Sequence, residues 1–199
     1  MPDRNTLAHV MHDAGLAAWF GGSLMGAVGV NGAAADVDDP RQRARVANAG
    51  WNRWTPVNAA AIGIHLLGAA QIAKANKGRI ATQKGVLGNT VVKTALTGGA
   101  LAATAYARYL GKKVKDAGDV PVAGGTEPMA TTPPEVAKSQ KQLKTLQWAI
   151  PGLTGAVLAS ASLHEEQQRP AQVVMGTLKK LPSMVATTAA GAVTAKKAS

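Results

Sequence analysis

The sequence contains no cysteine among its 199 residues, and it is poor in aromatic and acidic side chains. The absence of cysteine excludes a disulfide framework and any metal or redox site built on thiolates. Aromatic residues make up 4% of the chain, and 11 Asp and Glu face 22 Lys and Arg. No catalytic, cofactor-binding or nucleotide-binding motif stands out. We therefore expect a protein that is not an enzyme and holds no cofactor.

The chain contains several long stretches without a charged residue. Residues 14–35 form a run of 22, residues 54–73 a run of 20 and residues 145–163 a run of 19. An α-helix needs about 20 apolar residues to cross a hydrocarbon core roughly 30 Å thick. Most of the charged residues lie between these windows, a distribution typical of membrane proteins. The windows therefore predict membrane-spanning helices, although they are rich in Ala and Gly rather than in Leu and Phe.

Tryptophan and tyrosine lie at the ends of the apolar segments. Trp51 and Trp54 begin the second window, and Trp148 lies near the start of the last. Tyr106 and Tyr109 lie near the end of the less apolar segment between those two windows. Membrane proteins carry Trp and Tyr in belts at the two interfaces, so this placement favours a membrane.

Residues 85–111 form that less apolar segment, which would bring the number of spans to four. Its charge-free core, residues 94–107, has only 14 residues, so it crosses only if Lys93 and Arg108 extend their charged ends to the interfaces. The alternative is a helix that lies in the interface or against the bundle. The predicted fold class is all-α, a polytopic helical membrane protein with about four transmembrane helices packed through Gly and Ala.

The remaining segments complete the predicted organisation. Residues 1–13 are a polar lead, and residues 14–111 hold three hydrophobic helices with basic connectors. Residues 112–144 form a linker interrupted by Pro and Gly, residues 145–170 the fourth helix, and residues 171–199 a basic tail rich in Ala and Thr.

Several prolines bear on where the helices begin. Pro40 follows two aspartates in a sequence typical of a turn and helix start. Pro56 suits the first turn of the second span. The fourth helix could begin early, at Pro134, instead of at residue 145, and Pro151 predicts either a kink or a delayed start.

Residues 1–35 allow a second interpretation, a cleaved signal peptide. The three alanines at residues 33–35 resemble a small-residue cleavage site. Arg4, however, is the only basic residue of the lead and is outnumbered by Asp3 and Asp13. We therefore expect the first window to remain as a span.

The distribution of basic residues does not settle the orientation, because Lys and Arg divide equally between the two sides of a four-span arrangement. The short connector at residues 74–84 is strongly basic and has no acidic residue. This favours a multi-pass protein of the inner (cell) membrane with both termini cytoplasmic. Anionic lipid headgroups are then the nearest partner for the basic residues.

Small residues recur along the first window and form the most mechanistic pattern in the sequence. In lipid, such a stripe lets two helix backbones approach closely. Its partner is either another span of this chain or a second copy, and a chain rich in Gly and Ala also contains such stripes without a packing role. The stripe comprises Ala18, Gly22, Gly26, Gly29 and Ala33, in which Gly22 and Gly26 form a GxxxG pair.

Four polar side chains are expected at membrane depth, where ionisable groups are costly and often functional. They are Asn58, His65, Gln71 and Lys93. For His65 the plainer interpretation is a neutral imidazole satisfied by a neighbouring helix, and the alternative is a proton or substrate relay. For Lys93 we expect the ammonium group to extend to the interface.

The four histidines raise the question of haem or metal. With both termini inside, we expect His65 to lie about 12 Å deeper than His12 and His164, so that no second histidine is at its level. One further group of polar side chains comprises His9, His12, Asp13, His164 and Glu165. Because solvated polar residues would explain this group as well as a metal site would, we expect no metal.

Three stretches carry a resemblance. They are HDAGLAAWFGG at residues 12–22, WNRWTPVNAA at residues 51–60 and LHEEQQRP at residues 163–170. In this pattern residues 9–170 resemble small four-span integral membrane proteins of bacteria, of an Ala-rich type found in actinobacteria. The resemblance implies an architecture and no activity.

Three hypotheses follow for the function. The first is a non-enzymatic structural or accessory membrane component, alone, as a homo-oligomer or within a larger membrane complex. The second is a small transport or permeation module with His65 in its path. The third is a soluble basic helical protein that binds nucleic acid. We disfavour the third because the basic residues are dispersed, without the spacing of a zinc finger, RRM or helix-turn-helix.

Overall fold

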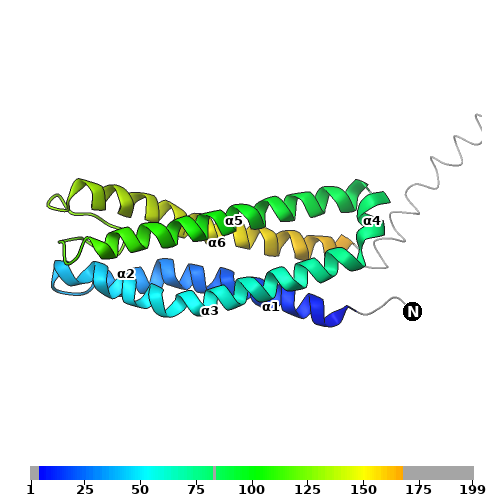
Figure 1. Ribbon diagram of the computed structural model, residues 1–199, viewed down its shortest axis with the longest axis horizontal. Helices are drawn as coiled ribbons and strands as arrows, with labels where there is room; N and C mark the ends of the chain where they lie inside the picture. Colours follow the sequence, from blue (N-terminus) through cyan, green and yellow to red (C-terminus); the bar gives the residue numbers. More distant parts are fainter. Residues whose placement is uncertain (1–4, 83, 168–199) are drawn as a thin grey trace, which may run out of the picture. The chain divides into compact units, whose positions relative to one another are not determined.

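In the computed structural model, which describes residues 5–82 and 84–167, every regular element is helical. The only extended pairing in these ranges is an isolated bridge between Val122 and Pro128. The all-α prediction is thereby confirmed. The elements are α1 (Thr6–Met25), the π-helix η1 (Gly26–Val30), α2 (Asn31–Ala35), α3 (Pro40–Ala75), α4 (Lys77–Thr82), α5 (Lys84–Asp116) and α6 (Pro134–Gln167) (Figure 1).

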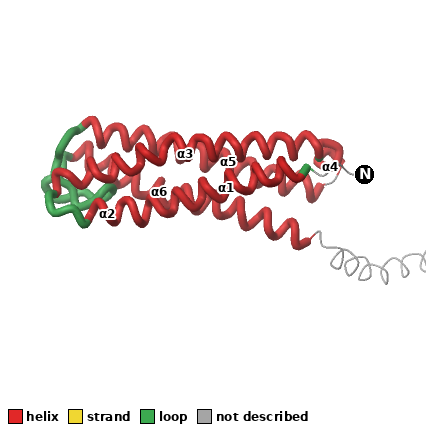
Figure 2. Tube along the Cα trace, turned by 90° about the horizontal axis from the view of Figure 1, so that it is seen from below, coloured by secondary structure: helices red, strands yellow, loops and turns green. Residues whose placement is uncertain are grey.

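The chain divides into two compact units, Met1–Leu158 and Ala159–Ser199. In the first unit α1, α3, α5 and α6 form a helical bundle in which each runs antiparallel to the one before it. The loops at residues 36–39 and 117–133 therefore lie together at one end, and α4 lies at the other (Figure 2). The second unit is described only as the end of α6, and the predicted tail lies outside the described residues.

The first helix starts earlier than predicted and runs through the whole first window. It begins at Thr6, so most of the predicted polar lead is helical. Helical dihedrals at Gly26 and Asn31 carry the backbone from α1 through η1 into α2 without a break. The early start has a packing reason, because Ala8 is fully buried against α3.

The third helix also corrects a predicted boundary. It starts at Pro40, where the carboxylate of Asp39 accepts a hydrogen bond from the backbone N–H of Arg41 at 3.0 Å. The basic connector between the first two charge-free windows, residues 36–53, is therefore mostly helix, and Pro56 lies inside α3 instead of at its start. Arg, Gln and Ala are good helix formers, and packing against α1 on both sides of Pro56 offsets the hydrogen bond that proline removes.

The predicted linker is shorter than expected. Helix α5 contains the whole of residues 85–111 and runs on to Asp116, and Gly118, at φ 77°, turns the chain after it. Helix α6 begins at Pro134, which confirms the early start. It continues through Pro151, so a start delayed to that proline is wrong. Most of the basic connector at residues 74–84 is helical as well.

The 117–133 loop is tied to the start of α3. Val122 donates from its backbone N–H to the carbonyl of Pro40 at 3.1 Å. The guanidinium of Arg43 donates to the carbonyl oxygens of Val37 at 2.7 Å and Ala123 at 3.1 Å. On α6, the buried amide of Gln140 donates to the carbonyl of Gly124 at 2.9 Å. These contacts fix the two loops at the same end of the bundle.

The apolar core of the bundle falls into two clusters. The larger one joins α1, α5 and α6, and the smaller one lies near the 117–133 loop. Among the described helices, one, α3, is long and apolar enough to cross a membrane by length and composition. The larger cluster comprises Leu16, Trp19, Ala100, Ala103, Ile150 and Val157, and the smaller Ala44, Val114, Val122 and Val136.

Candidate functional site

The backbones of α1 and α3 touch where two glycines face the opposite helix. A Cβ atom at Gly15 would lie 2.5 Å from the carbonyl oxygen of Ala61 and 2.6 Å from the backbone nitrogen of His65. A Cβ atom at Gly68 would lie 2.5 Å from the backbone nitrogen of His12. Neither position has room for a side chain, so only glycine permits this approach, as at small-residue helix interfaces in membranes.

Two members of the predicted small-residue stripe lie on the same contact. The indole of Trp54 covers Gly22 and that of Trp51 covers Gly26, so closely that a Cβ atom at either glycine would overlap the ring. The partner of this GxxxG pair is therefore α3 of the same chain. The absent side chains make room for the two tryptophans.

The other members of the stripe do not join this contact. Ala18 and Ala33 are exposed, and the nearest side chain to Gly29 is Met25 of the preceding turn. For these three residues, packing against a second copy stays a prediction.

A pair of histidines lies at the glycine crossing. His65 is 1% exposed, and its ring centroid is 4.4 Å from that of His12. Its Nδ1 lies 3.0 Å from the carbonyl oxygen of His12; because a carbonyl only accepts, Nδ1 carries the hydrogen. Nδ1 of His12 likewise donates to Oδ1 of Asp13 at 2.7 Å. The pair holds its two imidazoles in defined orientations.

The prediction that no histidine lies at the level of His65 is wrong. It placed His12 at the membrane edge and His65 about 12 Å deeper. Because α1 begins at Thr6, His12 lies within the helix and faces His65 across the crossing. Among the described residues, no group of three or more acidic or histidine side chains could hold a metal ion. The side chains of His164 and Glu165 lie outside the described part.

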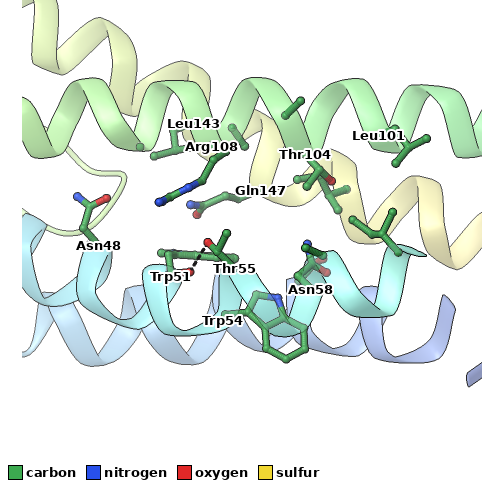
Figure 3. Close-up of a pocket in the computed structure, with 17 residues that line it drawn as sticks. Asn48, Trp51, Trp54, Thr55, Asn58, Leu101, Thr104, Arg108, Leu143 and Gln147 are labelled. Carbon is green, nitrogen blue, oxygen red and sulfur yellow. Dashed lines mark hydrogen bonds between the residues drawn. The ribbon is translucent and has the colours of Figure 1, made fainter. Parts of the chain in front are cut away.

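A cavity of about 330 Å³ lies between α3, α5 and α6 (Figure 3). Its walls are mainly apolar and include Ile62, Leu101, Leu143 and Ile150, together with the ring of Trp51. Helices that meet at glycine and alanine positions leave such spaces where a large side chain is missing. A cavity of this size falls at the lower end of the range for small-molecule sites.

Several polar side chains in the cavity wall already have partners. The hydroxyl of Thr55 donates to the carbonyl of Trp51 at 2.8 Å. Thr104 accepts a hydrogen bond from Nε1 of Trp19 at 3.3 Å, and Gln147 accepts one from the amide of Asn31. These groups are occupied in holding the bundle together.

Two buried polar atoms in the wall have no hydrogen-bond partner within the described residues. They are Nε1 of Trp54, a donor, and Oδ1 of Asn58, an acceptor. The two residues are four positions apart on α3 and therefore neighbours on one face of the helix (Figure 3). Both atoms have almost no accessible surface, so they are buried polar groups without a partner, which are uncommon in proteins.

One cation lies in the cavity wall. Arg108 extends from α5 toward α3 (Figure 3), and its Nη1 donates to Oδ1 of Asn52 at 2.6 Å. The residue is exposed, so its charge remains solvated at the edge of the cavity.

The four predicted intramembrane polar residues do not come together. Asn58 lines the cavity, whereas His65 packs between α1 and α3 and is not among the lining residues. Gln71 is exposed and its carbonyl accepts from Asn5 at 3.5 Å, and Lys93 is half-buried on α5.

Asn31, which was not among the predicted site residues, joins three helices. Its amide donates to Gln147 on α6, and its Oδ1 accepts from Nε1 of Trp51 on α3 at 3.1 Å. Asn31 and Gln147 are polar residues inside charge-free windows, and this position was the signal in the sequence that could have identified them as interhelical contacts.

The chemistry of the described residues therefore concentrates in two places, the contact of His12 with His65 and the cavity beside Trp54 and Asn58. Comparisons with family models, with curated proteins and with solved structures found no match.

Proposed function

We propose that this chain is an integral membrane protein whose four long helical segments cross the bilayer, and that it serves as a structural or accessory component rather than as an enzyme. The observation that carries the proposal is the distribution of side chains over the bundle. Polar side chains occupy part of its interior beside the apolar core, and many large apolar residues lie on its surface.

The interior positions show one half of this pattern. Three buried amides or imidazoles lie within the predicted spans, and each has a partner on a neighbouring helix. In lipid, hydrogen bonds between helices add to van der Waals packing, because hydrophobicity gives no net attraction between helices there. The three residues are Asn31, His65 and Gln147.

The surface positions show the other half. Leu67 is 59% exposed and Val91 is 57% exposed, and each lies about two helical turns inside the nearer end of its helix. Single exposed apolar residues are common on soluble proteins, but their concentration along α3 and α5 is typical of a lipid-facing surface. Others of the kind are Val28, Val57, Ile64, Val92 and Trp148.

The lengths and the order of the helices fit four crossings. Helix α3 is long and apolar enough to cross a membrane. The window at residues 14–35 is one continuous helical segment through α1, η1 and α2. Helices α5 and α6 have 33 and 34 residues. At 1.5 Å per residue each reaches about 50 Å, so their charged ends extend past a hydrocarbon core of roughly 30 Å. The basic residues there would contact anionic headgroups.

A structural role fits the way in which the polar side chains are used. Asn31, Trp19 and His65 each make contacts between helices and thereby fix their register. Transport along a path through His65 is not favoured, because its ring is enclosed by His12 and Trp19 and lies outside the cavity. Assembly with a second copy or with other membrane proteins is part of the proposal.

Membrane fractionation tests the proposal. The full chain should stay with the membrane pellet after washes in high salt and in alkaline carbonate, and detergent should release it. High salt removes proteins held only by charge, and carbonate removes peripheral proteins. Release of the chain by either wash would contradict the proposal, and steeply salt-dependent DNA binding by the released protein would support the nucleic-acid hypothesis instead.

A further inference from the structure

We infer that the cavity between α3, α5 and α6 is a lateral groove that holds one acyl chain of an anionic phospholipid, with the phosphate of that lipid at Arg108. The inference rests on the proposed function, because the lipid enters the groove from the surrounding bilayer.

The cavity is open at the surface of the bundle between α3 and α5. Its lining residues on α6 are Leu143, Gln147 and Ile150, which are buried and form its floor. Ala59 of α3 and Ala105 of α5 also line it and are exposed, which places the opening between these two helices. Their methyl groups are too small to close the gap. In a bilayer this opening faces lipid.

The groove has the length and the depth of one acyl chain. Its lining residues on α5 run from Gly111 to Leu101, about 15 Å at 1.5 Å per residue. One leaflet supplies half of a hydrocarbon core roughly 30 Å thick, so its acyl chains also extend about 15 Å. Arg108 directly follows the charge-free residues 94–107, and Leu101 lies in the middle of them. The groove therefore runs from the interface to the middle of the bilayer.

The volume and the lining suit a hydrocarbon chain. A methylene group takes up about as much space as a water molecule in the liquid, roughly 30 Å³, so a cavity of about 330 Å³ holds on the order of ten such groups. The deep end is lined by Ile62, Leu101 and Ile150, whose side chains present only carbon. The second acyl chain of the same lipid would remain outside, in the bilayer.

A cation lies at the shallow end of the groove. Arg108 extends from α5 toward α3 (Figure 3), and its Nη1 donates to Oδ1 of Asn52 at 2.6 Å. Asn52 is neutral, and in the described part of the chain no ion pair joins Arg108 to a carboxylate. The bond to Asn52 uses one N–H group of the guanidinium and leaves others for a phosphate. Lys112, one turn further along α5, is exposed and adds a second positive charge.

Other occupants fit this groove less well. A helix of a second copy, about 10 Å across, has several times the volume of the groove over the same length. An apolar molecule without a headgroup would leave Arg108 without a counter-ion. A zwitterionic lipid carries a phosphate, but its cationic group would lie near Arg108 and Lys112, where like charges repel. The charge at the shallow end therefore favours a lipid with a net negative headgroup.

Quenching of tryptophan fluorescence by brominated lipids tests the site, because bromine quenches an indole only at close range and Trp51 lines the groove. The full chain carrying Trp148→Phe is reconstituted in phosphatidylcholine vesicles with increasing fractions of brominated phosphatidylglycerol or brominated phosphatidylcholine. Trp148 is replaced because it is 52% exposed and would contact any surrounding lipid. We expect phosphatidylglycerol to associate about fivefold more strongly, the effect of one basic residue near an anionic headgroup.

Two pairs of variants in this background separate the charge from the shape of the groove. Arg108→Gln should abolish the preference for phosphatidylglycerol, whereas Lys113→Gln, at an exposed residue of α5 outside the groove, should keep it. Ala105→Leu narrows the opening and should remove most of the quenching by brominated phosphatidylglycerol. Ala102→Leu, also exposed on α5 but outside the groove, should not. Circular dichroism shows that each variant is folded, and Arg108→Lys, which restores the charge, should recover the preference.

Equal association of the two lipids with the unaltered groove, or a preference that survives in Arg108→Gln, would overturn the anionic headgroup. Quenching that Ala105→Leu leaves unchanged would overturn the groove as the site of the acyl chain. The chain with Trp148 in place separates these results from a failure of the proposed function, since brominated phosphatidylcholine should quench this exposed indole in any bundle that crosses the bilayer. Absence of that quenching would contradict the proposed function and the lipid site with it.

Discussion

Replacing Gly15 with leucine is expected to force α1 away from α3 and to destabilise the bundle by about 3 kcal/mol, the upper part of the range for overpacking. A Cβ atom at this position would lie 2.5 Å from the carbonyl oxygen of Ala61 and 2.6 Å from the backbone nitrogen of His65. Backbone atoms cannot turn aside as a flexible side chain does, so the whole helix must move. That movement would also separate His12 from His65.

Thermal unfolding followed by circular dichroism in detergent measures the effect. A loss of about 3 kcal/mol lowers Tm by about 10 °C in a chain of this size. Gly21→Leu is the matched control on α1, because nothing lies within 4 Å of a Cβ atom there. We expect its Tm to stay close to that of the native chain. If Gly21→Leu and Gly15→Leu lower Tm equally, the close contact between the two helices is not what stabilises the bundle.

Replacing Trp19 with alanine should destabilise the bundle by about 3–5 kcal/mol, as expected for a fully buried tryptophan. Trp19 is 0% exposed and packs within the larger apolar cluster. Its Nε1 also donates to Thr104 on α5, which would lose that donor. The variant would therefore combine a large internal cavity with the loss of a link between α1 and α5.

Chemical denaturation in detergent is a suitable measurement for this variant, with Trp148→Ala as the control. Trp148 is 52% exposed, so its removal leaves no enclosed cavity. The midpoint of Trp19→Ala should fall well below that of the native chain, and that of Trp148→Ala should change little. A midpoint for Trp19→Ala equal to that of the control would show that Trp19 is not buried in solution.

Much of the helical content could be predicted from charge-free windows, but the helix ends could not. The windows mark where charge is absent, whereas helices continue into charged segments whose residues favour helix and pack against a neighbour. Helix α3 is the clearest case, because it starts at Pro40, where the preceding aspartates indicated a helix start, and not at the beginning of the second window. The predicted start at Pro56 relied on the charge-free window and on the preference of proline for the first turn of a helix, and packing of α1 on both sides of that proline overrides it.

The candidate site was less predictable, because it depends on the register between helices. The GxxxG spacing marked Gly22 and Gly26, which the structure places under the two tryptophans of α3. Gly15 and Gly68, where the backbones touch, have no such spacing in the sequence and are paired only by the antiparallel alignment of α1 with α3. The contact of His12 with His65 and the cavity beside Asn58 depend on the same alignment.

The membrane-spanning bundle is tested most directly by cysteine accessibility in sealed vesicles, since the native chain contributes no thiol. Gly78 in α4 and Gly118 after α5 lie at opposite ends of α5. A membrane-impermeant maleimide should therefore label Gly78→Cys and Gly118→Cys from opposite sides. Ile64→Cys, 43% exposed on the bundle surface, should resist labelling from both sides because lipid covers it. Labelling of the two glycine variants from one side, or ready labelling of Ile64→Cys in intact vesicles, would contradict a bundle that crosses the bilayer.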